Sequence, residues 1–296
     1  MDSVITIRVK GGLGNQLFQY AAAYSLARRL NQELVLDTSF FPAQTLRGYK
    51  LGQLNVQFSK MAERLVFGIN LYKFKYLNKT LRNMKCRTLP CAAITTYFLE
   101  TCSDIITEYF TINKENIYMD GYFQSAKYFG QYRNELTEQI SPNYEQEDEY
   151  KIALNDIKTC NSVAVHVRRG DFLNAQNDPN PNHYLLNEQY YYNALEYMNE
   201  KVAKSVFFWF SDDIDWVKKY FGEQSDFRYI CLKTKHADID EMMLMKNCRH
   251  IISANSTFSW WASWLNMNEN AIHVCPAKRY GNLHMIPNDW IKIDIE

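Results

Sequence analysis

The second half of the chain alternates short apolar runs with segments whose apolar residues recur at helical spacing. The runs are rich in β-branched and aromatic side chains, which predicts strands, and the segments between them predict helices. Strands that alternate with helices indicate a parallel sheet with helices on both faces. The expected strands cover residues 162–167, 206–210, 228–232, 249–253 and 271–275, and the expected helices cover residues 190–200, 214–221, 238–247 and 259–266.

The beginning of the chain shows the same succession of patterns. Residues 4–9 predict a strand, which the glycine-rich segment 10–14 interrupts. Phe18, Ala22 and Leu26 then recur at every fourth position, which predicts a helix with an apolar face. Residues 33–37 predict a second strand. A doubly wound α/β domain begins with this β-loop-α-β succession.

The region between these two parts lacks a clean period. Residues 40–155 are rich in Tyr, Phe, Lys and Arg, and we expect helices and loops around a small sheet. The polar, acidic segment 143–151 indicates a domain boundary, and 296 residues suffice for two domains. We therefore predict an N-terminal domain over residues 1–150 and a C-terminal domain over residues 151–296, with about the last 15–20 residues packed back on the N-terminal domain.

Composition and charge narrow the class of function. The 33 basic and 33 acidic residues balance, which argues against nucleic acid as a partner. Seven scattered cysteines without a C-x-x-C pair indicate reduced thiols in a reducing compartment. The chain shows no signal-peptide pattern and no apolar run long enough to cross a membrane. We therefore expect a cytoplasmic protein.

Polar side chains follow three of the strands predicted in the second half. Ligands of an open α/β sheet bind beyond the carboxyl ends of its strands, so we expect these side chains to converge on one edge. Guanidinium, hydroxyl, amide and carboxylate groups together suit a nucleoside diphosphate. The candidate residues are His166, Arg168, Arg169, Ser211, Asp212, Asp213, Asn255, Ser256 and Thr257.

The candidates also have structural interpretations. Arg168 and Arg169 can hold diphosphate oxygens in bidentate fashion, or they can be a surface charge pair. Asp212 or Asp213 can accept hydrogen bonds from guanine, or it can cap the following helix. The hydroxyl groups after the fourth strand can likewise bind phosphate or cap a helix. Capping and binding are compatible, and the convergence of three loops favours a ligand.

Two other patterns match cofactor motifs only in part. Gly12 and Gly14 begin a dinucleotide-binding fingerprint, but Leu17 stands where its third glycine belongs, so nicotinamide binding is not expected. Asp238 and Glu241 have the spacing of a capping box, which we favour over a metal-binding D-x-D motif. No His/Cys cluster has zinc spacing. We expect no metal and no cofactor.

Four motifs, taken together, indicate a family. Residues 11–16 read GGLGNQ, residues 166–171 HVRRGD, residues 210–213 FSDD and residues 253–261 SANSTFSWW. In this order, over nearly the whole chain, they resemble glycosyltransferase family 11, the α-1,2-fucosyltransferases. The H-x-R-R motif alone is shared with α-1,6- and protein O-fucosyltransferases, whereas its combination with the first and last motifs is far more specific.

The resemblance implies an α/β fold of GT-B type, with two facing Rossmann-like domains that each hold a parallel sheet. The C-terminal domain would bind GDP-fucose and the N-terminal domain the acceptor. Arg168 would contact the β-phosphate, while His166 and one aspartate of residues 211–213 contact guanosine. Residues 256–257 would complete the phosphate site.

The resemblance also implies an inverting, metal-independent transfer of L-fucose from GDP-β-L-fucose to the 2-hydroxyl of a terminal β-galactoside. Arg168 would stabilise the departing diphosphate. Asp171 is our candidate for the general base, and a structural partner of Arg168 or Arg169 is its alternative role. Acceptor recognition is assigned to Gly12, Asn15, Gln16 and Gln124.

The expected acceptor is a β-galactoside oligosaccharide or a glycolipid, in the synthesis of a bacterial surface polysaccharide. Peripheral contact with the inner membrane is compatible with that role. Three alternatives stay open: another GDP-sugar transferase of the same fold, a non-catalytic glycan-binding protein, and a nicotinamide-dependent oxidoreductase. The nucleotide-binding pattern disfavours the second alternative, and the incomplete glycine fingerprint disfavours the third.

Overall fold

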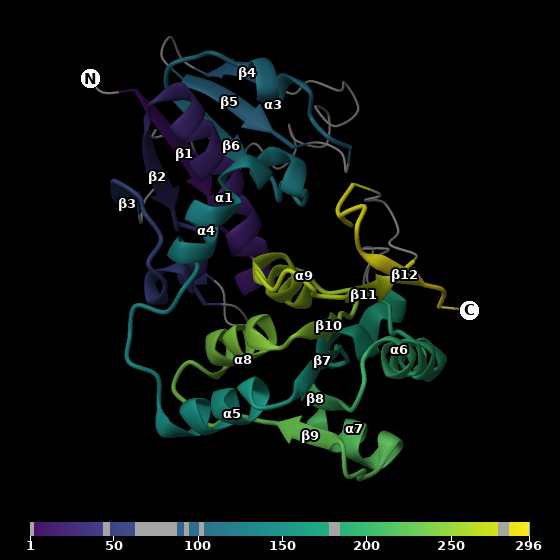
Figure 1. The fold of residues 1–296 in the computed structure, drawn as a ribbon. Coiled ribbons are helices and arrows are strands. Elements are labelled where there is room, and N and C mark those ends of the chain that lie inside the picture. Colours follow the sequence, from purple (N-terminus) through teal and green to yellow (C-terminus); the bar gives the residue numbers. More distant parts are fainter. Residues whose placement is uncertain are drawn as a thin grey trace. The chain divides into compact units, whose positions relative to one another are not determined.

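The computed structural model of the chain describes residues 3–43, 48–62, 88–91, 95–100, 104–177, 184–277 and 284–295 (Figure 1). The chain forms two α/β units, Met1–Asn143 and Tyr144–Glu296. Each unit is built around its own sheet, which has six strands among the described residues. The predicted α/β class and the two sheet-centred domains are confirmed.

The first unit opens with the predicted β-loop-α-β succession. β1 (Val4–Arg8) pairs in parallel with β2 (Glu33–Asp37), and α1 (Leu13–Leu30) connects them. Helix α1 is buried along most of its length because Ala, Leu and aromatic side chains cover it on several sides. The helix ends at Asn31, whose left-handed φ of 52° lets its N–H reach the carbonyls of Ala27 and Arg28.

The rest of the first sheet comes from the region without a clean period. The strand order is β3-β2-β1-β6-β5-β4, parallel except that β4 runs antiparallel to β5. The added strands are β3 (Lys60–Ala62), β4 (Thr88–Cys91), β5 (Thr95–Leu99) and β6 (Ile117–Asp120). Strand β6 is buried on both faces, which explains why alternation was missing. Short helices complete the unit: α3 (Glu108–Thr111), α4 (Arg133–Gln139) and the 3-10 turns Phe41–Ala43, Leu51–Gln53, Ala126–Tyr128 and Gly130–Tyr132.

The second unit follows the prediction closely. Its strands are all parallel, in the order β12-β11-β10-β7-β8-β9. All five predicted strands and four predicted helices are present within a few residues, and α5, β12 and a 3-10 helix at Gly170–Asn177 were not predicted. The strands are β7 (Asn161–Val167), β8 (Ser205–Ser211), β9 (Phe227–Ile230), β10 (His250–Ile252), β11 (His273–Pro276) and β12 (Ile291–Ile293). The helices are α5 (Asp148–Lys158), α6 (Glu188–Lys201), α7 (Ile214–Phe221), α8 (Ala237–Asn247) and α9 (Thr257–Leu265).

The two units divide between Asn143 and Tyr144, at the start of the polar segment 143–151 and not at its end. Helix α5 begins inside that segment and belongs to the second unit, where its residues Tyr150 and Ile157 are buried. At the other end of the chain, β12 pairs with β11 in the second sheet. The packing of the last residues on the N-terminal domain stays a prediction.

Candidate functional site

The three polar loops predicted in the second half lie along one edge of the second sheet. We call residues 166–171, 211–213 and 253–257 the second-unit edge. Strand β7 pairs with β10 on one side and with β8 on the other, so their carboxyl ends are adjacent. The N–H of Arg169 donates to Asp212 Oδ1 at 2.9 Å, and the ring of His166 lies 5.5 Å from that of Phe258. The structure therefore brings the three loops together.

Arg168 is held between two carboxylates. Its Nε and Nη2 donate to Asp171 Oδ1 at 3.1 and 2.6 Å, and its Nη1 lies 2.8 Å from Asp212 Oδ2. These contacts fix the plane of a side chain that is 20% exposed and has five N–H donors in all. The geometry matches the alternative role of Asp171 as a partner of Arg168, and its role as general base stays a prediction.

Gly170 allows this arrangement. A Cβ atom at residue 170 would lie only 2.4 Å from Asp212 Oδ2, the oxygen that contacts Arg168. Any larger residue would therefore push the Asp212 carboxylate away. The glycine of the HVRRGD motif is explained by this close approach of a side chain to the backbone.

Arg169 is oriented by a carboxylate and an aromatic ring. Its Nε donates to Asp213 Oδ2 at 3.1 Å, and its guanidinium carbon lies 3.6 Å from the centre of the Trp216 ring. Asp213 also accepts the N–H of Trp216 at 3.3 Å and so caps α7. The capping interpretation of Asp213 is confirmed, and the same carboxylate orients Arg169. Ser211 supports the turn by accepting the Asp213 N–H at 3.0 Å.

His166 is a buried and neutral member of the edge. Only 4% of the residue is exposed, and its Nδ1 has no hydrogen-bond partner among the described residues. Burial, and then the charge of Arg168, lower the pKa of His166 to about 3. The imidazole is therefore uncharged at neutral pH. A buried polar atom without a partner is rare in folded proteins and indicates a ligand or water contact at that position.

The third loop of the edge begins α9. Ser256 is the N-cap of this helix, and its Oγ accepts the N–H of Phe258 at 3.2 Å. Thr257 is the first residue of the helix, and Asn255 donates from Nδ2 to the carbonyl of Tyr184 at 2.9 Å. The capping interpretation of Ser256 is confirmed. A helix N-terminus at the edge of a sheet also favours the binding of an anion.

Two of the predicted acceptor residues contact each other in the first unit. Gln124, which follows β6, donates from Nε2 to Asn15 Oδ1 at 2.8 Å. Asn15 lies in the first turn of α1, and Gly12 is the N-cap residue of that helix. The structure thus joins three of the four predicted acceptor residues at one end of α1. Their role in binding stays a prediction.

Gln16 holds two loops of the first unit together. Its Nε2 donates to the carbonyls of Gly11 and Gly48, both at 2.9 Å, and its Oε1 accepts the N–H of Lys50 at 2.9 Å. The residue is fully buried. A direct contact with an acceptor would break these bonds, so the geometry does not favour the predicted role of Gln16.

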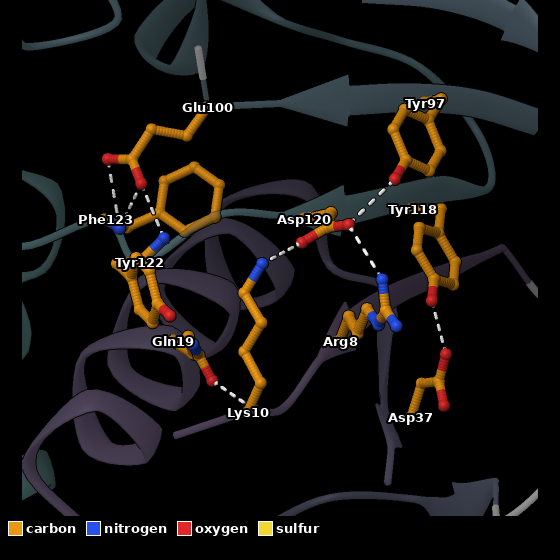
Figure 2. A network of polar contacts seen from close by, with 10 residues as sticks. All are labelled: Arg8, Lys10, Gln19, Asp37, Tyr97, Glu100, Tyr118, Asp120, Tyr122 and Phe123. Atoms are coloured by element: carbon orange, nitrogen blue, oxygen red, sulfur yellow. Dashed lines mark hydrogen bonds and ion pairs between the residues drawn. The ribbon is translucent and has the colours of Figure 1, made fainter. Parts of the chain in front are cut away.

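The carboxyl ends of β1, β2, β5 and β6 carry a second polar cluster, which we call the first-unit edge (Figure 2). Asp120 accepts from Lys10 Nζ at 2.5 Å, Arg8 Nη1 at 3.3 Å and the Tyr97 hydroxyl at 3.0 Å. Asp37, also buried, accepts from the hydroxyl of Tyr118. Burial alone would raise the pKa of Asp120, but Lys10 and Arg8 together hold it below its ordinary value.

Comparison with known proteins assigns the chain to a family. The model of the family described as Glycosyl transferase family 11 matches residues 4–291. The chain belongs to glycosyl transferase family 11. The predicted resemblance is confirmed, and with it the class of enzyme, a glycosyltransferase of the fucosyltransferase type.

Two relatives agree with this family, and a solved structure agrees with the fold. The alpha-1,2-colitosyltransferase of Escherichia coli is 31% identical over 304 residues, which cover 99% of each protein. The O-antigen biosynthesis glycosyltransferase WbnK of Escherichia coli is 29% identical over 315 residues, with 96% of this chain and 99% of that protein covered. A variant of Arabidopsis thaliana FUT1, solved in complex with GDP, matches with a TM-score of 0.53 at 14% identity over 97% of this chain and 75% of that one. The GT-B-type α/β fold is thereby confirmed.

Sequence reasoning missed part of the site in this family 11 member. Trp216 lies on Arg169 but is an ordinary aromatic position of a helix, so no signal marked it. At the first-unit edge, Arg8 and Asp37 end strands that were predicted. Their buried partners lie in β5 and β6, which were not predicted, so the strand-end rule could not be applied there.

Two further expectations concern helices and metals. Asp238 does not cap α8, because the helix begins at Ala237 with His236 before it, and Glu241 instead accepts the N–H of Leu232 at 3.2 Å. Within the described ranges, no three His, Cys, Asp or Glu side chains are placed to hold a metal ion, and metal independence stays a prediction. None of the helices in those ranges is long and apolar enough to cross a membrane.

Proposed function

We propose that this protein transfers L-fucose from GDP-β-L-fucose to the 2-hydroxyl of a terminal β-galactoside, with inversion and without a metal ion. The observation that carries the proposal is the second-unit edge, where two oriented arginines meet a buried, neutral histidine and a helix N-terminus. Cations and backbone N–H groups suit a diphosphate. The α-1,2 linkage in the name of the Escherichia coli colitosyltransferase supports the choice of the 2-hydroxyl.

The donor is placed by residues of all three loops. Arg168 and Arg169 hold the diphosphate, and the N-terminus of α9 with Ser256 and Thr257 adds donors to it. His166 contacts guanosine through the atom that is unpartnered in the described part of the chain. Asp212 or Asp213 accepts hydrogen bonds from guanine. Each of these carboxylates already pairs with an arginine, so the one that binds guanine has two partners.

The chemistry is a single displacement. The acceptor hydroxyl attacks C1 of the sugar and gives its proton to a general base, for which Asp171 is the candidate, while the bond from C1 to the diphosphate oxygen breaks and GDP leaves with its electron pair. Negative charge grows on the departing GDP, where fixed guanidinium groups stabilise it more than they stabilise the bound donor. Asp171 accepts a hydrogen bond from Arg168 and orients that group. This contact favours an orienting role for Asp171 over the role of general base.

One observation favours a second donor. The colitosyltransferase matches this chain over nearly its whole length, and colitose is L-fucose without its 3-hydroxyl. A site that hydrogen-bonds the 3-hydroxyl strongly rejects the sugar that lacks it. A site that makes no hydrogen bond to the 3-hydroxyl accepts both L-fucose and colitose. GDP-colitose is therefore the alternative donor. In either case we infer a cytoplasmic enzyme of surface-polysaccharide synthesis, with peripheral contact at the inner membrane for a lipid-linked acceptor.

The test is GDP release from GDP-fucose and from GDP-colitose, with lactose as acceptor and EDTA present. We expect release with GDP-fucose, an α-1,2-linked product by NMR, and near-complete loss in Arg168→Ala. Faster turnover of GDP-colitose would move the assignment to that donor. Absence of release with any galactoside, despite GDP binding, would contradict the acceptor.

A further inference from the structure

The turn after β6 is held by a carboxylate of the neighbouring strand. Glu100, the residue after β5, accepts the N–H of Tyr122 at 2.5 Å and the N–H of Phe123 at 3.1 and 3.0 Å (Figure 2). Gly121 allows this approach, because a Cβ there would lie 2.4 Å from the Cβ of Glu100. The pKa of Glu100 is raised by burial, even though the two backbone N–H groups oppose the shift.

The same turn holds a strained residue. Phe123 has a φ of 51°, in the left-handed region that is unfavourable for an aromatic residue. Its ring is fully buried and stacks on Phe98 with 6.2 Å between the ring centres. Strained residues of this kind persist where surrounding contacts over-determine them, and they cluster at ligand sites. The turn therefore has one conformation, which the ring of Phe123 and the carboxylate of Glu100 fix together.

The fixed turn presents an aromatic ring at the surface. Tyr122 is 40% exposed, whereas most large aromatic residues in the described part of the first unit are buried. Lys10 Nζ lies 5.1 Å from the centre of the Tyr122 ring. Two residues further on, Gln124 bonds Asn15. An exposed aromatic ring is suited to a sugar, whose apolar C–H face packs on the ring, and amide groups such as those of Gln124 and Asn15 bond sugar hydroxyls.

We propose that Tyr122 is the platform on which a sugar ring of the acceptor glycan stacks, and that Glu100 is the positioning residue that holds Tyr122 in place. The proposal rests on the proposed function and on the expectation, from the family resemblance, that the N-terminal domain binds the acceptor. It adds a stacking residue to the predicted amide pair of Gln124 and Asn15. It also explains why a strained turn occurs at the carboxyl ends of parallel strands, where ligands bind.

The experiment compares Tyr122→Ala, Tyr122→Phe and Glu100→Gln with Tyr192→Ala, an exposed tyrosine of the second unit. Loss of the ring raises the acceptor KM roughly tenfold, as expected for one aromatic contact. Tyr122→Phe stays near wild type. Glu100→Gln raises the acceptor KM similarly, because it replaces one of the two oxygens that accept from the Tyr122 and Phe123 N–H groups by an NH₂ group, which cannot accept. Donor KM, and GDP release to water without acceptor, stay unchanged in all four variants.

A second measurement separates this proposal from the proposed function. Saturation-transfer NMR with lactose is expected to show binding to wild type and Tyr192→Ala, and its loss in Tyr122→Ala. If wild type transfers no fucose but binds lactose through Tyr122, the reaction is wrong and the platform stands. An acceptor KM in Tyr122→Ala within twofold of wild type, or absence of lactose binding to wild type, overturns the platform. A melting temperature of Glu100→Gln equal to wild type with an unchanged acceptor KM overturns the positioning role.

Discussion

The two sheets of this protein end in polar clusters that contain the same groups at different depths. At the second-unit edge, Arg168 and Arg169 meet carboxylates that are 26–45% exposed. At the first-unit edge, Arg8 and Lys10 meet Asp120, whose side chain is 3% exposed. The strand-end rule places charge at both edges. Burial decides the consequence, since a buried ion pair becomes part of the fold while a half-exposed one can exchange partners with a ligand.

The largest expected effect is on stability at the first-unit edge. Asp120→Asn leaves two cations without their carboxylate, and breaking a buried pair costs about 3–5 kcal/mol. Asp212→Asn is the matched control at the half-exposed edge, where the cost is expected below about 1 kcal/mol. Chemical denaturation of both variants at pH 7 measures the difference. Equal losses would contradict the distinction between the two edges.

Next in size is the loss of catalysis at the second-unit edge. Arg168→Ala removes a positioned donor to the departing diphosphate, so kcat is expected to fall by about 10²–10³. Its melting temperature should stay close to that of wild type. Arg228→Ala, an exposed arginine of the same unit, is the control and should keep its activity. Loss of stability in place of activity would make Arg168 a structural residue.

A pH experiment concerns Glu241, a carboxylate whose ionised form is disfavoured by burial and by acidic neighbours. Burial raises the pKa of Glu241 to about 7, and Asp238, Asp240 and Glu149 add to the shift. The folded protein then binds more protons than the unfolded chain between about pH 4.5 and 7, so stability falls as pH rises through that window. Glu241→Gln should be more stable than wild type at pH 8 by about 1–3 kcal/mol and similar near pH 5. An equal gain at both pH values would assign the effect to packing.

The smallest expected effect concerns Asp171. As a half-exposed partner of Arg168 it orients the guanidinium, and Asn can keep part of that contact. Asp171→Asn is therefore expected to lower kcat less than about tenfold and to leave the pH–rate profile in place. A loss of more than about 10²-fold with an altered acidic limb would restore Asp171 as the general base.

The same contrast appears in what the sequence could predict. In the second unit, regular apolar runs located every strand that positions the site, and the polar residues after them met as expected. In the first unit, the rings of Tyr97 and Tyr118 stack on each other and are buried. Their strands therefore lack the alternation of apolar and polar residues that identifies a half-exposed strand. The Glu100 turn depends on a left-handed Phe123, which no local pattern marks.

The sequence also could not predict which side chains pair with each other. The motif HVRRGD indicated arginines for a ligand, but whether Asp171 is a base or a partner of Arg168 depends on where η5, at Gly170–Asn177, directs it. Likewise, Asp238 and Glu241 have capping spacing, yet α8 begins at Ala237, two residues earlier than a cap at Asp238 would allow. Spacing predicts which pairings are possible, and tertiary contacts choose among them.

Calorimetric titration of GDP into wild type, Arg168→Ala and Tyr122→Ala tests the central claim most directly. The claim is that the second-unit edge holds the nucleotide and the turn that presents Tyr122 in the first unit holds the acceptor. We predict binding to wild type, at least tenfold weaker binding to Arg168→Ala, and wild-type affinity in Tyr122→Ala. Unchanged affinity in Arg168→Ala, or loss of GDP binding in Tyr122→Ala, would contradict it.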